Sequence, residues 1–368
     1  MKQTSITTIP ARQKADTDPS ASLLAAQRRS AELESQIAIE PARFRILTGD
    51  RPTGPLHLGH YFGTLASRVR LQQAGVQLFV LIADYQVLTD REVADRLSER
   101  VDGLIADYLA VGIDPASATI FAHSAVPALN QLMLPFLSMV SVTELDRNPT
   151  VKEEIALSRQ RAVSGLMFTY PVHQAADILF CKANLVPVGK DQLPHVQITR
   201  AIARRFNERY AAGAAFFPIP DPLLSTAPSM LGTDGAKMAK SRGNSIPLSA
   251  TADETARLIK GAKTDARRDI SFEPAARPEV SSLVLLAALC QGREPEQVAA
   301  DIGPRGAAVL KRVVTESVNE FLRPIRARRA ELAADPGGLR QVLREGNARA
   351  SAIASRTLTE VHALMGTG

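Results

Sequence analysis

Short apolar runs alternate with helix-length amphipathic segments over the first half of the chain. The runs lie at residues 44–47, 78–83 and 119–122, each bounded by Gly, Asp or Ser, and helical spacing fills segments such as 91–111. Strands that alternate with helices in this way are typical of a parallel sheet with crossover helices. The pattern therefore predicts an α/β fold whose ligands gather just after the strands, near Gly49, Asp84 and Ser124.

The pattern changes to helices alone in the last third of the chain. A further strand is predicted at residues 184–188 and a helix with a basic face at 192–210. Beyond residue 245, helical spacing covers residues 251–263, 280–290, 304–332 and 338–365, and Pro324 should kink or divide the third of these helices. We predict an α/β domain over residues 41–235, a loop at 236–245 and an all-helical domain over 246–368.

Residues 1–40 differ from both regions. They are rich in Ser, Thr, Ala and charge, and a helix that is possible at residues 21–37 has no clear apolar stripe. A segment of this kind buries too little apolar surface to offset its conformational entropy. We interpret it as a mobile N-terminal extension.

Composition narrows the class of protein. The chain has 368 residues, 45% of them hydrophobic, and no apolar run approaches the roughly 18–20 residues of a membrane-spanning helix. No secretory or transit pattern is visible, so a cytoplasmic location without membrane attachment is expected. Cys181 and Cys290 have no spacing that would indicate a disulfide framework or a zinc site. A net charge of +6 is compatible with an anionic partner such as nucleic acid.

Two short motifs, about 180 positions apart, indicate a nucleotide site. Pro55-Leu56-His57-Leu58-Gly59-His60-Tyr61 follows the first strand, and Lys237-Met238-Ala239-Lys240-Ser241 lies in a glycine-flanked loop. Gly59 allows close approach of a ligand at a helix start, where free N–H groups attract phosphate, and the lysines can bracket a leaving pyrophosphate. A single histidine at such a turn is more often structural, and a single lysine-rich loop is more often a solvated surface turn. Both motifs together occur much more rarely by chance, so the pair favours a functional site.

These motifs resemble the HIGH and KMSKS signatures of class I aminoacyl-tRNA synthetases. Residues 48–54, 147–152, 170–178 and 186–192 narrow the resemblance to the tryptophanyl-tRNA synthetase family, and it extends from about residue 44 to the C-terminus. The resemblance implies a Rossmann-like parallel-sheet catalytic domain with an all-helical C-terminal domain that binds the tRNA anticodon. It also implies ATP with Mg²⁺, L-tryptophan and tRNA(Trp) as substrates and partners, and a homodimer.

The resemblance also assigns candidate site residues. The catalytic candidates are His57, His60, Lys237 and Lys240. The ATP-binding candidates are Arg51, Pro52, Thr53, Gly59, His60, Gly189, Lys190, Asp191, Lys237, Met238, Ala239, Lys240 and Ser241. The tryptophan-binding candidates are Asp177, Tyr170, Gln174, Gln192, Gln86 and Leu47, with Asp177 accepting the indole N–H. The candidates for tRNA contact are Arg323, Arg326 and Arg329, and no protein metal site is predicted.

The chain departs from the family pattern at five positions. Each of these positions has a different residue in many relatives: Arg51 (usually Gln), His60 (Asn), Ala239 (Ser), Gln174 (Met) and Gln86 (His). The last change, together with the wording of residues 48–54, resembles the auxiliary second type of bacterial tryptophanyl enzyme.

Other interpretations of single residues stay open at this point. Asp177 could cap a helix, Asp191 could be the N-cap of the helix predicted at 192–210, and the arginines could form a solvated helix face. Rival functions are a tyrosyl-tRNA synthetase, a smaller nucleotidyltransferase with only the first motif, and a catalytically weakened paralogue with a binding or regulatory role. The segment around Asp177 and the second motif favour a tryptophan-activating enzyme over all three.

Overall fold

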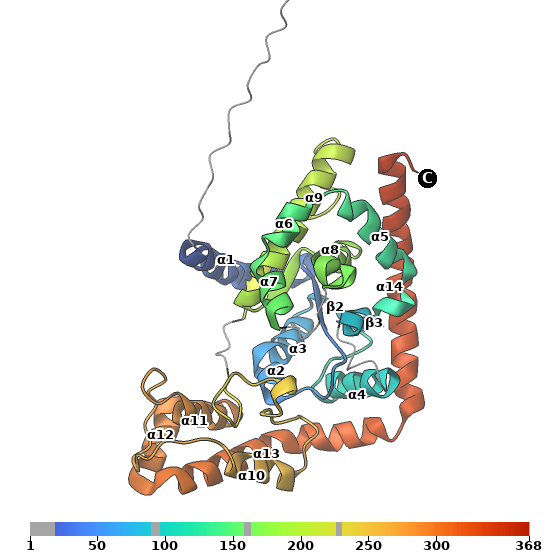
Figure 1. Cartoon of the computed structure of the whole chain (residues 1–368). Helices are drawn as coiled ribbons and strands as arrows, with labels where there is room; N and C mark the ends of the chain where they lie inside the picture. Colours follow the sequence, from blue (N-terminus) through green and yellow to red (C-terminus); the bar gives the residue numbers. More distant parts are fainter. Residues whose placement is uncertain (1–18, 90–95, 158–162, 226–229, 368) are drawn as a thin grey trace, which may run out of the picture.

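The computed structural model describes residues 19–89, 96–157, 163–225 and 230–367. Its centre is a five-stranded parallel sheet in the order β3-β2-β1-β4-β5 (Figure 1). The strands are β1 (Arg45–Asp50), β2 (Gln77–Ile82), β3 (Ala118–Ala122), β4 (Leu185–Val188) and β5 (Asp221–Leu224). The predicted α/β fold is confirmed. The sequence pattern did not predict β5, a four-residue edge strand that contains Pro222, because proline is atypical of strands and tolerated mainly at edges.

Helices cover both faces of the sheet, so the strands are apolar almost throughout. Leu78 and Val80 of β2 face one core with α3 (Ala66–Gln73) and α4 (Leu97–Ala110). Phe79 and Leu81 face the other core, formed with α5 (Pro127–Leu137), α8 (Gly165–Leu179) and α9 (Leu193–Tyr210). Three shorter helices complete this part: α2 (Leu58–His60), α6 (Val142–Asp146) and α7 (Pro149–Leu157).

The N-terminal segment corrects our interpretation. From Pro19 the chain forms helix α1 (Pro19–Ile39), which packs along β5 at the sheet edge. Leu33 and Ile37 are buried one helical turn apart, and Ser30 Oγ accepts a hydrogen bond from the backbone N–H of Leu224 at 2.9 Å. Arg29 pairs with Asp221 at 2.7 Å. The mobile-extension interpretation is therefore wrong for residues 19–39, which form a helix that packs on the sheet edge. Residues 1–18 lie outside the described part.

The C-terminal helices form two groups. Helices α10 (Ala252–Lys260), α11 (Pro278–Gln291), α12 (Pro295–Ile302) and the long α13 (Gly306–Ala333) pack together below the sheet (Figure 1). The helical backbone of α13 continues through Pro324, so this proline does not divide it. Within the described residues, no helix combines the length and the hydropathy that crossing a membrane requires.

The last helix, α14 (Pro336–Met365), returns to the sheet instead of joining that helical group. The backbone N–H of Ala122 in β3 donates to Asn347 Oδ1 at 3.0 Å, and Thr357 Oγ1 donates to the carbonyl of Phe180 at 2.7 Å. A Cβ on Gly346 would lie 1.7 Å from the carbonyl oxygen of Ile120, so only glycine allows this approach. The predicted boundary at residue 246 therefore does not separate α14 from the sheet.

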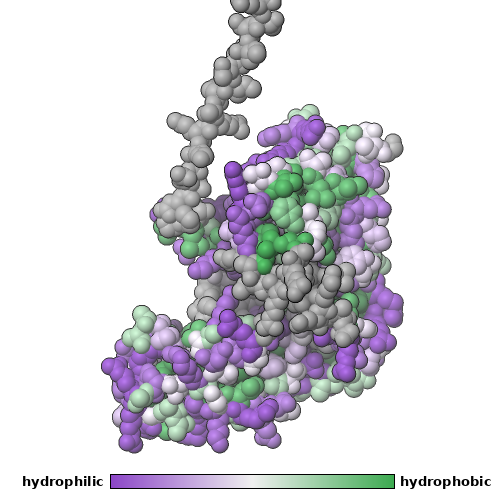
Figure 2. Space-filling model, viewed as in Figure 1, coloured by the Kyte–Doolittle hydropathy of each residue, from purple (hydrophilic) through white to green (hydrophobic). Residues whose placement is uncertain are grey.

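Apolar side chains are exposed on the face that carries α5. Leu134 of α5 is 76% exposed and Val142, the first residue of α6, is 72% exposed. Figure 2 shows apolar residues gathered over α5 on this face. Apolar residues that gather into one exposed patch, rather than lying scattered singly, mark a candidate interaction surface.

Candidate active site

The first motif forms a turn at the carboxyl end of β1. His57 has an extended backbone and Leu58 begins a helical run that continues through α2 into α3. The backbone N–H of His57 donates to His60 Nδ1 at 3.2 Å, and the two rings lie 3.7 Å apart between centroids. The backbone N–H of Leu56 donates to Asp107 Oδ2 at 2.9 Å, which fixes the entry to the turn.

The structure brings the second motif against the first. The backbone N–H of Leu58 donates to the carbonyl of Ile246 at 3.0 Å, and that of Leu248 donates to the carbonyl of Leu56 at 2.9 Å. A Cβ on Gly59 would lie 3.0 Å from the His57 ring and 3.3 Å from the sulfur of Met238. Segments about 180 positions apart therefore share one short antiparallel contact, and Gly59 leaves the room for it.

Lys240 points toward the turn after β1. Its Nζ donates to the carbonyl of Gly54 at 2.8 Å, and burial lowers its pKa while the nearby carboxylates of Asp50 and Asp107 oppose that change. Lys237 is exposed, Met238 is buried, and Ala239 is half-buried. The side chain of Ser241 lies outside the described part.

Asn244 holds this loop and was missed by sequence reasoning. Its Oδ1 accepts from the backbone N–H of Ala239 at 2.9 Å, and its Nδ2 donates to Asp234 Oδ1 at 2.7 Å and to the carbonyl of Lys237 at 3.2 Å. A Cβ on Gly232 would lie 2.4 Å from Asn244 Nδ2. An asparagine in a polar loop has no distinctive sequence signal, so only the contacts reveal its role.

Both motif histidines are neutral at physiological pH. Burial lowers the pKa of His57 to about 3 and that of His60 to about 4. Beneath them, Asp50 accepts from the buried Arg68 at 2.5 Å and from Tyr108 at 2.7 Å, and the Arg68 charge holds the Asp50 pKa well below its usual range although burial opposes this. The site therefore offers neutral imidazoles beside the Lys240 ammonium, an environment suited to an anion.

Residues 189–192 form a second wall after β4. Gln192 Nε2 donates to Asp191 Oδ2 at 3.0 Å, and Thr150 Oγ1 donates to the carbonyl of Asp191 at 2.8 Å. A Cβ on Gly189 would lie 2.6 Å from Asp191 Oδ1. Helix α9 begins after Gln192 without a side-chain cap, so Asp191 does not take the capping role. Lys190 and Asp191 are exposed.

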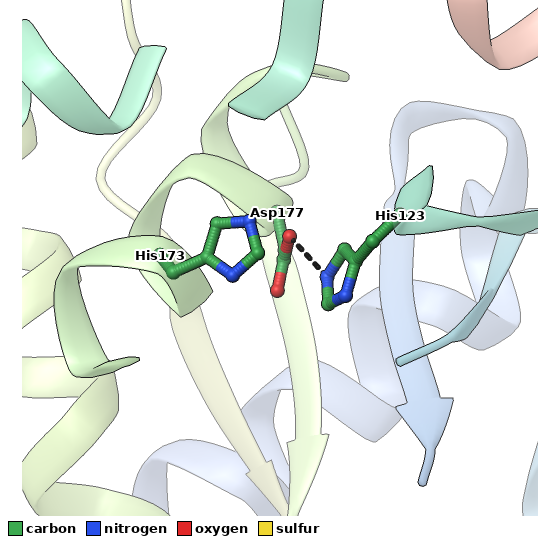
Figure 3. A group of neighbouring side chains, drawn as sticks. All are labelled: His123, His173 and Asp177. Atoms are coloured by element: carbon green, nitrogen blue, oxygen red, sulfur yellow. Dashed lines mark hydrogen bonds and ion pairs between the residues drawn. The ribbon is translucent and has the colours of Figure 1, made fainter. Parts of the chain in front are cut away.

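Tyr170, Gln174 and Asp177 are spaced four and three positions apart on α8 and so share one face of it. Asp177 lies inside α8, which begins at Gly165 with Ser164 as N-cap, so the alternative that Asp177 caps a helix is wrong. Its side chain is 1% exposed and accepts from His123 Nε2 at 2.8 Å (Figure 3). A buried carboxylate held by an imidazole is a fixed acceptor.

Three histidines near this face were missed by sequence reasoning. His123 follows β3, and its ring is 4.4 Å from that of His173 on α8 between centroids. Burial lowers the pKa of His173, and it lowers that of His195 to about 4. His195 Nε2 lies 2.8 Å from the Tyr170 hydroxyl, and its Nδ1 lies 3.3 Å from Asn148 Nδ2. The four-residue spacing of His173 and Asp177 was the one available signal.

The remaining pocket candidates surround the same helix. Leu47 of β1 is buried in the core that includes Ala175 and Ala176 of α8. Gln86 and Gln174 are half-buried, and Gln86 lies in the helical turn η3 (Tyr85–Thr89), which contacts α8. Of the ATP candidates after β1, Arg51 is exposed, Pro52 is buried and Thr53 is half-buried.

Comparison with known proteins decides the family. The sequence profile of the class I tRNA synthetases (W and Y) matches residues 40–323. The chain belongs to this family. Among curated relatives, the synthetase is 40% identical to the tryptophan–tRNA ligase of Treponema pallidum over 88% of this chain and 96% of that one. It is 41% identical to the tryptophan–tRNA ligase of Streptococcus pyogenes serotype M1 over 87% and 97% of the two chains.

Solved structures agree with this assignment. The tryptophanyl-tRNA synthetase of Campylobacter jejuni, complexed with ADP and tryptophan, superposes with a TM-score of 0.76 and 28% identity. The alignment covers 88% of the synthetase and all of that chain. The tyrosyl-tRNA synthetase of Archaeoglobus fulgidus, with a TM-score of 0.58 and 22% identity, shares the fold.

The arginines predicted to contact tRNA have other partners in the synthetase. Arg329 Nε donates to the buried Asp107 at 2.6 Å, and Arg326 donates to Thr255 Oγ1 at 2.8 Å. Arg323 is exposed and pairs with Glu320 on its own helix. Because Asp107 also holds Leu56 beside the first motif, Arg329 links α13 to the turn after β1.

Proposed function

We propose that the synthetase is a tryptophan–tRNA ligase. It activates L-tryptophan with ATP to tryptophanyl-adenylate, releases pyrophosphate, and transfers the aminoacyl group to the 3′ end of tRNA(Trp). The observation that carries this proposal is the buried Asp177, held by His123 in a chain about 40% identical to tryptophan–tRNA ligases.

Asp177 is proposed to accept the indole N–H. This N–H is the only polar hydrogen on the tryptophan side chain, and a hydrogen bond from it to a carboxylate is charge-assisted, contributing about 1.5–3 kcal/mol. The phenol of tyrosine presents a hydroxyl and a smaller ring instead. Tyr170, Gln192, Gln174, Gln86 and Leu47 are proposed to complete the pocket around the amino acid.

Adenylate formation needs positioning and charge stabilisation more than proton transfer. Lys237 and Lys240 are proposed to stabilise the charge that builds on the departing pyrophosphate, while Gly59 and the neutral His57 and His60 lie against the nucleotide. The remaining ATP candidates, at residues 51–53, 189–191, 238, 239 and 241, are proposed to line the same site.

Magnesium is proposed to arrive with ATP. Two carboxylates near Lys240 already form ion pairs, Asp50 with Arg68 and Asp107 with Arg329. Mg²⁺ keeps several waters and is commonly held through substrate phosphates. This arrangement fits an ion bound by the phosphates and water, where it supplies positive charge to the reacting phosphate.

Three further proposals concern the whole protein. The exposed Leu134 and Val142 support a homodimer in which a second copy covers this face. The helical group α10–α13 is proposed to bind the tRNA anticodon, with Arg323, which is exposed and pairs with Glu320 on its own helix, as the basic candidate. The cytoplasm is the proposed location. The resemblance to the auxiliary type of enzyme stays a prediction.

Aminoacylation of a tRNA(Trp) transcript tests the proposed function. Purified protein with ATP, Mg²⁺ and tryptophan should charge the transcript, and charging should weaken steeply with salt because phosphate contacts release counterions. Arg323→Glu should reduce charging more than Arg312→Glu, a matched exposed arginine on the same helix paired with Glu316. Binding of tryptophan without any charging would instead favour a weakened paralogue.

A further inference from the structure

The side chains of His123, His173 and Asp177 form a buried cluster. Recognition of the indole N–H requires only the Asp177 carboxylate, so the two imidazoles are not explained by it. Each of the three side chains offers a ligand atom within 4.8 Å of the others, and their exposed fractions are 0%, 3% and 1%. Figure 3 shows the Asp177 carboxylate between the two imidazoles, with one hydrogen bond, to His123. His123 comes from the turn after β3, and the other two residues come from α8.

The hydrogen bonds of Asn130 fix the proton on His173. Asn130 Nδ2 donates to the carbonyls of His123 at 2.9 Å and Val126 at 3.2 Å, so Asn130 Oδ1 is the atom that faces His173. His173 Nε2 lies 2.8 Å from this oxygen and must carry the proton. In the neutral ring, Nδ1 is therefore an unprotonated nitrogen with a free lone pair, and it is buried without a hydrogen-bond partner.

The far nitrogen of His123 also faces an acceptor. His123 Nε2 donates to Asp177, while Nδ1 lies 4.0 Å from Asp84 Oδ1 and has no hydrogen-bond partner. Asp84 is fixed by the backbone N–H groups of Tyr85 at 3.0 Å and Ser124 at 3.2 Å. If the His123 proton moves from Nε2 to Nδ1, it faces Asp84, and Nε2 becomes a second lone pair beside Asp177.

This arrangement matches the outer support of metal-binding histidines, whose far nitrogen donates to a carboxylate or a carbonyl oxygen. Asn130 Oδ1 accepts a hydrogen bond from His173 in this way. Asp84 Oδ1 lies 4.0 Å from His123 Nδ1, beyond hydrogen-bond distance but on the side where an acceptor would support a metal-bound His123. Ordinary core packing does not explain it, because an unpaired buried acceptor costs about 1–3 kcal/mol. The lone pair of His173 Nδ1, the Asp177 carboxylate and, once the His123 proton has moved to Nδ1, the lone pair of His123 Nε2 converge where only a hydrogen-bond donor or a cation would satisfy them all.

We propose that His123, His173 and Asp177 bind a divalent transition-metal ion of the zinc type. Two imidazole nitrogens and one carboxylate oxygen form a three-ligand set that leaves a fourth position for water. Zinc–nitrogen distances are about 2.0–2.1 Å, so the three ligand atoms need to move together by roughly 1 Å. If Asp177 receives the indole, a step that rests on the proposed function, the ion and tryptophan compete for it.

Cobalt provides the direct test. Metal-free protein titrated with Co²⁺ should develop the visible absorption of a tetrahedral cobalt site with one ion per chain, and Zn²⁺ should displace it. His173→Gln should weaken Zn²⁺ binding at least about tenfold, and Asn130→Ala should weaken it by a comparable factor because it removes the outer support. His362→Gln, a change in α14, should bind as the unchanged protein does. Circular dichroism checks that each variant is folded.

Two results would overturn the proposal. One is the lack of a cobalt spectrum in the unchanged protein, and the other is equal Zn²⁺ affinity in the folded His173→Gln variant. A second measurement separates this proposal from the proposed function. Zn²⁺ should raise the apparent KM for tryptophan in pyrophosphate exchange without changing that for ATP. Stoichiometric metal binding without this inhibition would support the metal site and contradict the proposal that Asp177 binds the indole.

Discussion

At the scale of single residues, the ATP end of the site combines neutral imidazoles with one partly buried ammonium. Burial keeps His57 and His60 uncharged, so the charge that meets phosphate comes from the lysines. Lys240 is bound to the carbonyl of Gly54 beside the first motif, while Lys237 is exposed. A loop lysine with a fixed backbone partner is already positioned before a nucleotide binds.

Lys240→Ala should therefore reduce kcat much more than it changes the KM for tryptophan. The lysine meets charge that develops only as pyrophosphate leaves, so its loss raises the barrier rather than weakening amino-acid binding. Steady-state pyrophosphate exchange measures both constants. A variant with normal kcat and a raised KM for tryptophan would contradict this role, because Lys240 would then act on tryptophan binding and not on the departing pyrophosphate.

The buried histidines also predict an acid dependence of stability. The pKa values of His57, His60 and His195 in the folded state are about 3, 4 and 4, below the unfolded value of about 6.5. Between pH 6.5 and pH 4 the unfolded chain binds more protons, so the free energy of unfolding should fall as pH falls through this window. Carboxylates with lowered pKa values lose their contribution only below about pH 4.

Urea unfolding at pH 7.5, 6 and 5 checks this dependence. His195→Gln should flatten the decrease, whereas the control His362→Gln should leave it unchanged. A stability that is constant from pH 7.5 to pH 5 would contradict neutral burial of these rings.

At the scale of elements, sequence patterns identified most helices but not the surfaces against which they pack. Helical spacing at residues 338–365 predicted α14, yet nothing in a helical period says which core the helix joins. Gly346, Ala350 and Ala354, each four positions from the next, allow close packing on β3, and such a small-residue stripe is visible only once the partner is known. Leu33 and Ile37 were missed on α1 for the same reason.

Gly346→Ala should destabilise the protein by several kcal/mol or prevent folding. The added methyl group would meet the Ile120 backbone at 1.7 Å, and backbone cannot rotate away as a side chain can. The control is Gly165→Ala at the first turn of α8, where a Cβ meets nothing within 4 Å. Thermal unfolding compares the two, and equal stability would mean that α14 does not lie on β3 as described.

At the scale of the whole molecule, the sequence predicted the parallel sheet and the meeting of two distant motifs, because both depend on strong local patterns. It could not predict His123, His173, Asn244 or Asp107 as site residues. His123, His173 and Asp107 are single polar residues whose importance comes from partners far away in sequence, as when Asp107 joins Leu56 to Arg329. Asn244 has local partners, but an asparagine in a polar loop carries no distinctive signal. Long-range polar contacts leave no period or spacing to detect.

The exposed apolar face predicts the oligomeric state. If a second copy covers Leu134 and Val142, Leu134→Glu should convert the dimer to a monomer, since an unpaired buried charge is costly at an interface. Sedimentation velocity measures this directly. Arg204→Gln, which also lowers the net charge by one, serves as a charge-matched control at an exposed position of α9, and a monomeric unchanged protein would contradict the proposal.

The central claim is that Asp177 selects tryptophan, and amino-acid-dependent exchange of pyrophosphate into ATP tests it most directly. The unchanged protein should exchange with tryptophan and not with tyrosine, because a site built to satisfy one polar group rejects a mismatched side chain by up to about 10⁴–10⁵. Asp177→Ala should lower tryptophan-dependent exchange at least about tenfold while the fold is retained, the loss of about 1.4 kcal/mol or more from a charge-assisted bond. Full exchange activity in the folded Asp177→Ala variant, or a preference for tyrosine in the unchanged protein, would contradict the account.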